Sequence, residues 1–272
     1  MPVENPTKAA LSIQQFTSSE AGAWSNSYLI GGKSEAILFD VFMLRGDAKQ
    51  IVDGIVKSGK TLTTVMISHA HPDHFMGLEV IADRSPEARI VSTQNVVADI
   101  KTDGPWMFSM LQGKLGPQGP TRLVVPEPLA EPVLVIEGTK LDVVEFGESE
   151  SKHIASVYLP NERALLSADL VYNKAHLYLQ ERHLESWLAC LDELEAFAKD
   201  RVDIIYPGHG AGGDLTLIAQ TRSYLHEFGN AVRSGSAQTA QQQMLDRYPD
   251  YHVRQFLTVF SIPAFFPAVQ LT

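Results

Sequence analysis

Residues 68–74 (SHAHPDH) constrain the fold of this chain more than any other stretch of its sequence. They follow a short β-rich run at residues 63–68 (TTVMIS). They lead into residues 72–85 (PDHFMGLEVIADRS), which have the pattern of a helix with Pro72 in its first turn. The chain must therefore turn from a strand into a helix within a cluster of ionisable side chains.

Four potential metal ligands lie within this segment. His69 and His71 are separated by one residue, so their side chains project to the same side of an extended chain, and Asp73 and His74 follow at once. Buried imidazoles and carboxylates would need several hydrogen-bond partners, and protonated imidazoles would repel one another. A metal ion removes both costs, because neutral imidazole and carboxylate are good zinc ligands. The alternative is a solvated turn that happens to be rich in histidine.

The rest of the chain alternates between strands and helices in two similar halves. This order predicts an α/β fold. The predicted strands lie at residues 11–16, 27–41 (two strands around a Gly-Gly turn), 63–68, 88–93, 133–138, 140–147, 154–160, 163–169 and 202–208, and the predicted helices at residues 47–59, 72–85, 95–101, 184–200 and 215–232.

A Gly- and Pro-rich segment, residues 102–132, separates the two halves. Its composition predicts a long loop, and loops of this length inside a domain are usually functional or disordered. Its apolar residues Trp106, Met107 and Phe108 argue against disorder and favour a lid-like insertion that lines a substrate pocket. The alternative is a loop that its aromatic residues anchor to its own domain.

The pattern His69-x-His71-x-Asp73-His74, between a β-run and a helix, resembles the metal motif of the metallo-β-lactamase superfamily. The resemblance continues in order from about residue 10 to 215, through NSYLI…AILFD (26–40), LLSAD (165–169) and IIYPGHG (204–210). It implies a four-layer αββα sandwich of two similar halves, with the metal site at one edge of the two sheets. We expect residues 1–232 to form this domain and residues 233–272 to form a C-terminal helical, aromatic extension packed on it.

The resemblance also implies two adjacent divalent metal ions, in the first instance zinc, with iron or manganese as alternatives. A hydroxide held between two metals is a strong nucleophile at neutral pH, because metal binding lowers the pKa of water to about 7. Asp73 and Asp169 are the implied catalytic residues. Read residue by residue, the resemblance gives His69 and His71 to the first metal, gives Asp73, His74 and His209 to the second, and makes Asp169 the bridge between them.

The sequence departs from the superfamily pattern at the third ligand of the first metal. The superfamily usually has a histidine after a glycine in this loop, whereas here Glu148 follows the glycine, with Glu150 and His153 close by. We expect Glu148 to ligate, with His153 as the second choice, and a weakly held or absent first metal remains a third possibility. A carboxylate ligand would favour iron or manganese more than an all-histidine site would. The alternative is a solvated loop.

Three more residues, Tyr172, Asn173 and His176, follow Asp169 in a region that lines the active-site mouth in this superfamily. Together with Trp106 and Phe108 they are the predicted substrate contacts. Packing or local loop hydrogen bonds are the alternative for each of the three.

The implied activity is metal-dependent hydrolysis of an ester, lactone, thioester or amide of a small molecule. Asp169 argues against β-lactams as main substrates, since β-lactam-hydrolysing members typically carry Cys or Ser there. A carboxylate at position 148 keeps open an iron-dependent redox enzyme of the same fold, of the sulfur dioxygenase or oxygen reductase type. A β-lactamase-like amidase is a further alternative.

Composition narrows the partners and the compartment. The chain has 22 Lys and Arg against 32 Asp and Glu, a net charge of −10, which argues against nucleic-acid binding. No secretory signal and no membrane-spanning apolar run is evident, and the single cysteine, Cys190, permits no intramolecular disulfide, so we expect a cytoplasmic protein. The apolar tail at residues 256–267 (FLTVFSIPAFFP) is a possible homo-oligomer contact.

Overall fold

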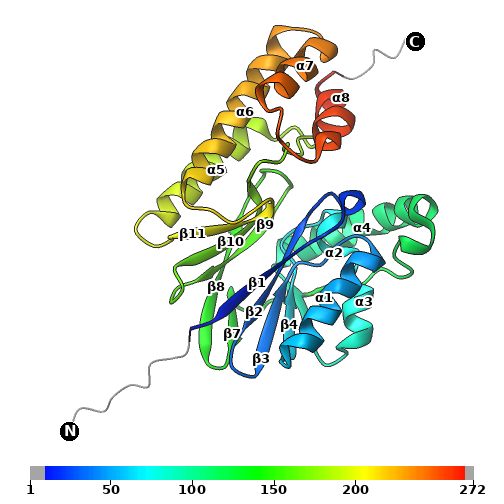
Figure 1. Cartoon of the computed structure of the whole chain (residues 1–272), viewed down its shortest axis with the longest axis vertical. Helices are drawn as coiled ribbons and strands as arrows, with labels where there is room; N and C mark the ends of the chain where they lie inside the picture. The colour runs from blue at the N-terminus through cyan, green and yellow to red at the C-terminus, as the bar shows by residue number, and fades with distance from the viewer. Residues whose placement is uncertain (1–9, 267–272) are drawn as a thin grey trace.

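Two β-sheets lie between two layers of helices (Figure 1). The structure, a computed structural model, describes residues 10–266. The ends of the two predicted domains, residues 1–9 and 267–272, therefore lie outside the described residues. Buried side chains of both sheets and of the helices on them form a single core. The predicted four-layer αββα arrangement of two halves is confirmed.

The first sheet mixes antiparallel and parallel pairing. Its first two pairs, β1 with β2 and β2 with β3, are antiparallel, and its remaining pairs are parallel. Strands β2 and β3 are almost wholly buried, including the polar Asn26 and Ser27 at the start of β2. The order across the sheet is β1 (Ser12–Thr17), β2 (Asn26–Gly31), β3 (Glu35–Phe39), β4 (Thr61–Met66), β5 (Arg89–Ser92) and β6 (Glu127–Pro128).

Helix α1 (Arg45–Ser58) follows β3 and ends at Gly59, whose φ of 68° is left-handed and suits glycine. The helix predicted at residues 72–85 is instead two helices, α2 (Pro72–Phe75) and α3 (Leu78–Arg84). Gly77 separates them because its backbone packs against Phe42. Its N–H donates to the Phe42 carbonyl at 2.7 Å, and a Cβ at position 77 would lie 2.4 Å from the same oxygen.

The prediction of a loop at residues 102–132 is wrong for its first half, because helix α4 spans Gln94–Leu115 and includes Pro105. Thr93 caps this helix by accepting a hydrogen bond from the backbone N–H of Val96. A short 3-10 turn (Gly116–Gln118) follows α4. Residues spaced three or four apart bury one face of the helix, and this packing outweighs its Gly and Pro content: Val96, Val97, Ile100, Gly104 and Leu111.

The second sheet has the order β11-β10-β9-β8-β7 and is antiparallel except for the β10–β11 pair. Helix α5 (Leu184–Ala198) packs on it through Trp187, which is fully buried and donates its indole N–H to the Leu170 carbonyl at 3.0 Å. The strands are β7 (Val133–Ile136), β8 (Thr139–Phe146), β9 (Ile154–Leu159), β10 (Ala164–Tyr172) and β11 (Ile204–His209).

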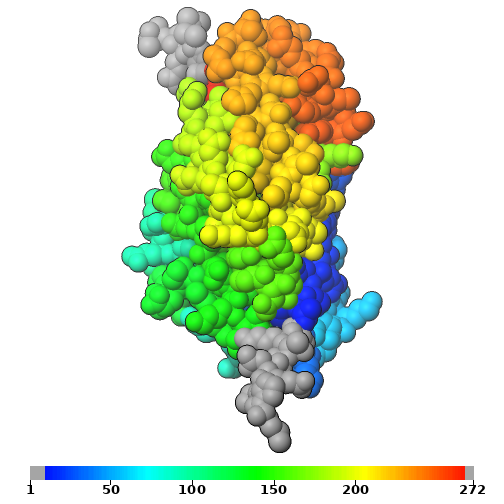
Figure 2. Space-filling view, turned by 90° about the vertical axis from the view of Figure 1, so that its left-hand side faces the viewer, coloured from blue at the N-terminus to red at the C-terminus, as the bar shows by residue number. Residues whose placement is uncertain are grey.

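The C-terminal helices form one end of the molecule. Figure 2 shows α6 (Thr216–Ser234) and α7 (Ala237–Arg247) there, continuous with the layer made by α5. A π-helical segment, η3 (Phe256–Ser261), and helix α8 (Ile262–Phe265) follow. Within the tail predicted to mediate oligomerisation, Leu257 and Ile262 are buried in the chain's own core, and the oligomer itself remains a prediction. Among the described helices, none combines the length and hydropathy needed to span a membrane.

Candidate metal centre

The four ligands predicted from the first motif lie where β4 ends and α2 begins. His69 and His71 occupy the extended connection, and Asp73 and His74 belong to the first turn of α2. His69 and His74 are fully buried, and His71 is 6% exposed. The end of a strand, the proline at the start of a helix and the buried imidazoles therefore all fall within these few residues.

The second half supplies Asp169 and His209 from adjacent strands. Strand β10 is irregular at Ala168, whose φ of 49° breaks the register with β11 and turns the next side chain, Asp169, into the site. His209 ends β11, and its Nε2 lies 3.2 Å from Asp169 Oδ2 and 3.4 Å from Asp73 Oδ2. The imidazole of His74 lies between the two carboxylates, with Nε2 at 3.3 Å from Asp169 Oδ1 and 3.5 Å from Asp73 Oδ2.

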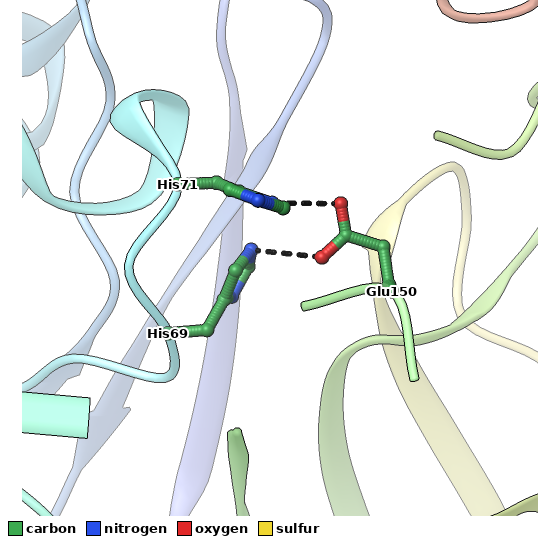
Figure 3. Close-up of side chains that lie close together, drawn as sticks. All are labelled: His69, His71 and Glu150. Atoms are coloured by element: carbon green, nitrogen blue, oxygen red, sulfur yellow. Dashed lines mark ion pairs between the residues drawn. The ribbon is translucent and has the colours of Figure 1, made fainter. Parts of the chain in front are cut away.

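Glu150 completes a second group of ligand atoms beside His69 and His71. Figure 3 shows the two imidazoles pointing from the connection after β4 toward the Glu150 carboxylate, which comes from the opposite side. The distances are 2.8 Å from His71 Nδ1 to Glu150 Oε1 and 3.4 Å from His69 Nε2 to Glu150 Oε2. In each ligand group of the centre, the potential ligand atoms lie within 4.8 Å of one another.

Six atoms of this cluster are buried and have no hydrogen-bond partner. Such atoms are costly, because a buried polar group normally needs a partner to offset its desolvation. Nitrogen and oxygen atoms that face one another in this way suit a divalent cation such as zinc, iron or manganese. The atoms are His69 Nε2, His74 Nε2, His209 Nε2, Asp73 Oδ2, Glu150 Oε2 and Asp169 Oδ1.

The outer ring nitrogens of the four histidines are each paired. Nδ1 of His74 pairs with Asp40 Oδ2 at 3.0 Å, and Nδ1 of His209 donates to the Ala23 carbonyl at 3.0 Å. Nδ1 of His69 pairs with the Ser68 hydroxyl at 2.8 Å, and that hydroxyl donates in turn to Asp40. Nε2 of His71 pairs with Glu181 Oε1 at 2.9 Å. Outer partners of this kind fix the tautomer and aim the inner nitrogen's lone pair at the centre.

Asp40 and Glu181 take part in the centre, although the sequence analysis assigned neither of them a role. Asp40 is buried and accepts hydrogen bonds from both the backbone N–H and the hydroxyl of Ser68. Asp40 directly follows β3, and a carboxylate at a strand end is a usable signal. Glu181 lies 110 residues from His71 in a segment with no motif.

The electrostatics of the cluster favour a bound cation. Burial raises the pKa of Glu150 to about 8, although His71 opposes this shift. Burial lowers the pKa of His69 well below its usual range, and His74 adds to the effect. Burial alone would also lower the pKa of His209, but Asp169 and Asp73 raise it to about 9. Protons and a metal ion therefore compete for the same nitrogen and oxygen atoms.

The two glycines around His209 allow the close packing of β10 and β11. A Cβ at Gly208 would lie 1.7 Å from Asp169 Oδ1. A Cβ at Gly210, whose φ is 91°, would lie 1.9 Å from the Asn173 carbonyl oxygen. At Gly208, the Asp169 carboxylate of the neighbouring strand takes the space that a side chain would fill, and at Gly210 the Asn173 carbonyl takes it.

Of the three residues considered for the third ligand of the first group, the structure brings only Glu150 beside His69 and His71. Glu148 is exposed, and His153 points to helix α4, where its Nδ1 pairs with Asp99 Oδ2 at 2.7 Å. Glu150 takes the expected position instead. A tight turn in which the Ser149 N–H donates to the Ser151 carbonyl at 2.9 Å directs the Glu150 carboxylate, 2% exposed, toward His69 and His71.

Tyr172, Asn173 and His176, the predicted substrate contacts that follow Asp169, do not line the cavity that opens beside the cluster. The Tyr172 hydroxyl donates to Asp169 Oδ2 at 2.5 Å, and its ring stacks on His209 with 5.0 Å between centroids. Asn173 donates its amide to the Ala211 carbonyl at 2.7 Å, and His176 is fully buried with Nδ1 at 2.8 Å from the Tyr224 hydroxyl. Tyr172 therefore orients metal-centre residues, and the other two have structural partners.

A cavity of about 340 Å³ opens directly beside the cluster. Trp106 and Met107 line it, as predicted for the segment that holds them, whereas Phe108 does not. His71, Asp73 and Glu150 form its polar base. The C-terminal segment closes the opposite side of the cavity with Phe256 and Phe260.

A family profile described as "Metallo-beta-lactamase superfamily" matches residues 25–209 of this chain, a span that includes the first motif, Glu150, Asp169 and His209. The chain belongs to this superfamily. Its fold agrees with solved members. It covers 98% of the DIM-1 metallo-beta-lactamase with 80% of its own length, at 20% identity and a TM-score of 0.61. It likewise covers 99% of the metallo-beta-lactamase from Pontibacter korlensis with 80% of its own length, at 19% identity and a TM-score of 0.58.

Two curated relatives of this superfamily member match only in part. The linear primary-alkylsulfatase of Pseudomonas sp. (strain ATCC 19151) is 23% identical over 188 residues, which are 56% of this chain and 35% of that protein. The uncharacterized protein YobT of Bacillus subtilis (strain 168) is 32% identical over 69 residues, which are 25% of this chain and 29% of that protein. The chain thus spans about a third of the length of these relatives.

Proposed function

We propose that this superfamily member is a hydrolase of small molecules that depends on two divalent metal ions, with zinc as the first choice. The observation that carries this proposal is the set of six inward-facing, unpartnered ligand atoms. His69, His71 and Glu150 would hold one ion, and Asp73, His74 and His209 the other. Asp169, whose two oxygens face different imidazoles, would lie between the ions.

Bound ions would act as Lewis acids and lower the pKa of a water molecule to about 7. The chain's own residues would orient the reactants. Burial alone would raise the pKa of Asp73, but His74 and His209 hold it below its usual range, so the Asp73 carboxylate at the cavity base stays ionised and accepts hydrogen bonds. Burial raises the pKa of Tyr178, so its hydroxyl on the cavity wall stays protonated, and it donates to Gln180 Oε1 at 2.6 Å.

The proposed reaction is cleavage of an ester, lactone, thioester or amide bond. The sulfate ester is a further substrate class, because the curated relative with the longer match acts, by its name, on linear primary alkyl sulfates. The β-lactamase structures are less than 25% identical to this chain and support the fold alone. The carboxylate of Glu150 among the ligands is the one observation that favours the alternative, an iron-dependent redox enzyme.

Elemental analysis of the purified protein followed by a substrate panel tests this proposal. We expect about two equivalents of zinc per chain, and turnover of at least one carboxylic or sulfate ester that a chelator stops and zinc restores. Zinc-loaded protein that hydrolyses no ester, lactone, thioester, amide or sulfate ester would contradict the proposal. Iron as the bound metal, with oxygen consumption in the presence of a persulfide, would establish the redox alternative.

Replacing Glu181 with Ala is expected to weaken metal binding about tenfold to hundredfold, the usual effect of removing an outer-shell partner. The reason is that Nε2 of His71 loses its acceptor, so the ring no longer holds one tautomer. Competition with a chromophoric chelator measures the affinity. Glu181→Gln keeps an acceptor oxygen and should recover most of it, and Glu185→Ala, an exposed glutamate nearby, is the matched control. Unchanged affinity in Glu181→Ala would rule out the positioning role.

A further inference from the structure

We propose that the cavity beside the metal centre takes the hydrocarbon chain of an uncharged substrate, so that the hydrolase acts on esters or lactones with an alkyl or aryl tail. This inference rests on the proposed function and names its substrate class. The cavity carries it, because its base holds polar cluster residues while its walls are mostly apolar, with Gln180 and Gln255 as polar exceptions. A substrate lying in it would place its polar, scissile end at the cluster and its tail between the walls.

The walls come from two segments that are far apart in the sequence. Helix α4 contributes Trp106, Met107 and Met110, and η3 contributes Phe256 and Phe260 from the C-terminal end. Figure 1 shows α4 and α8, which directly follows η3, on the same side of the molecule. Methionine side chains are flexible and polarizable, so they adapt to tails of different shape.

The described cavity walls offer no cationic side chain to a polyanionic substrate. No Lys or Arg occurs among the described residues that line the cavity, and its ionisable residues are His71, Asp73, Glu150 and Tyr178. Recognition of phosphate or of several carboxylates normally uses Arg or Lys. Carriers that bear phosphates therefore find no cationic partner on these walls, whereas an uncharged hydrocarbon tail gains free energy from leaving water.

Trp106 supports a substrate as the occupant of this cavity. Its side chain is 65% exposed, the highest value among the exposed large apolar residues of the described chain. It lies at a concave cavity that leads to Asp73 and Glu150, and not on a flat face. A volume of about 340 Å³ falls within the range of pockets that take small molecules. A second protein chain would have to insert a segment into the cavity to cover Trp106.

The test uses two homologous series with the metal-loaded, full-length protein. Binding of n-alkanols from butanol to octanol is measured by displacement of the neutral dye N-phenyl-1-naphthylamine. Hydrolysis of p-nitrophenyl esters from acetate to octanoate is measured as kcat/KM. Each added methylene is expected to raise affinity and kcat/KM about threefold to fourfold until the cavity is filled. Values that do not change with chain length would overturn the inference.

Three variants of similar size separate the cavity wall from the rest of helix α4. Met107→Gln and Met110→Gln replace wall residues with a polar side chain that keeps length and helix propensity. Both should reduce the increase per methylene in binding and in hydrolysis. Leu115→Gln, a half-buried position on the same helix away from the cavity, is the matched control and should behave like the wild type. Equal slopes in all four proteins would contradict the assignment of the wall.

The two readouts distinguish failure of this inference from failure of the proposed function. Chain-length-dependent alkanol binding, without hydrolysis of any substrate in the ester, lactone, thioester, amide and sulfate ester panel, supports the hydrocarbon site and contradicts the hydrolase. Metal-dependent hydrolysis without chain-length dependence in either series supports the hydrolase and contradicts the hydrocarbon site.

Discussion

Replacing Asp169 with Asn is expected to lower kcat/KM by roughly a hundredfold to a thousandfold or more, the range seen when one preorganised electrostatic group is removed from an active site. The effect should be large because Asp169 faces both His74 and His209 and accepts a hydrogen bond from Tyr172. An amide carries no charge to balance two divalent ions. Metal content, measured by elemental analysis, should fall together with activity.

Thermal or urea unfolding provides a readout of the Asp169 variant that does not depend on catalysis. Metal bound only by the folded state stabilises it, by about 2.7 kcal/mol at a hundredfold excess over Kd. The wild type should show this gain when zinc is added, and Asp169→Asn should lose most of it. Asp142→Asn removes a carboxylate from an exposed position on β8 and should keep both the gain and the activity. A full zinc-induced gain in Asp169→Asn would show that Asp169 is not a ligand.

Gly208→Ala tests the same carboxylate without changing a ligand. The new Cβ would lie 1.7 Å from Asp169 Oδ1, so Asp169 must move away from the centre or β11 must shift. We expect metal affinity and activity to fall as in Asp169→Asn. Gly113→Ala, a site in α4 where a Cβ would meet nothing within 4 Å, is the matched substitution and should leave both unchanged.

The part of the centre that could be predicted from the sequence is the part that local geometry determines. Residues 68–74 combine a strand end, alternate side chains and a helix start, so the direction of His69 and His71 follows from the backbone alone. The resemblance supplied Asp169 and His209, which the structure brings within 3.2 Å of each other. Their approach depends on pairing of β10 with β11, which no local pattern encodes.

Helix α4 and Glu150 show why the remainder could not be predicted. Gly and Pro suggested a loop after residue 102, but the Thr93 cap and a continuous buried face stabilise a helix through Pro105. In the loop after β8, counting from the glycine pointed to Glu148, whereas a turn closed by Ser149 and Ser151 decides which glutamate points inward. The first outcome depends on tertiary packing and the second on the geometry of one turn, and residue spacing in one sequence reveals neither.

The loop that carries Glu150 provides the second large expected effect. Glu150→Gln should remove one of the two metal equivalents. Activity should fall by at least about tenfold to hundredfold, which is the loss expected when only a hydrogen-bond partner of a ligand is removed. The reason is that its carboxylate is buried between His69 and His71, and a neutral amide is a weaker ligand for a cation. Elemental analysis of dialysed protein and kcat/KM on one ester measure the two effects.

Glu148→Gln is a closely matched control for Glu150→Gln, since it makes the same chemical change two residues away on an exposed side chain. It should keep both metal equivalents. His153→Gln breaks the pair with Asp99 that ties the loop to α4, so it should weaken metal binding less than Glu150→Gln does. If Glu148→Gln loses a metal equivalent and Glu150→Gln keeps both, the first metal is held by the residue that the glycine spacing indicated. The turn at Ser149 must then rearrange when metal binds, because Glu148 is exposed and only Glu150 reaches the two imidazoles in this structure.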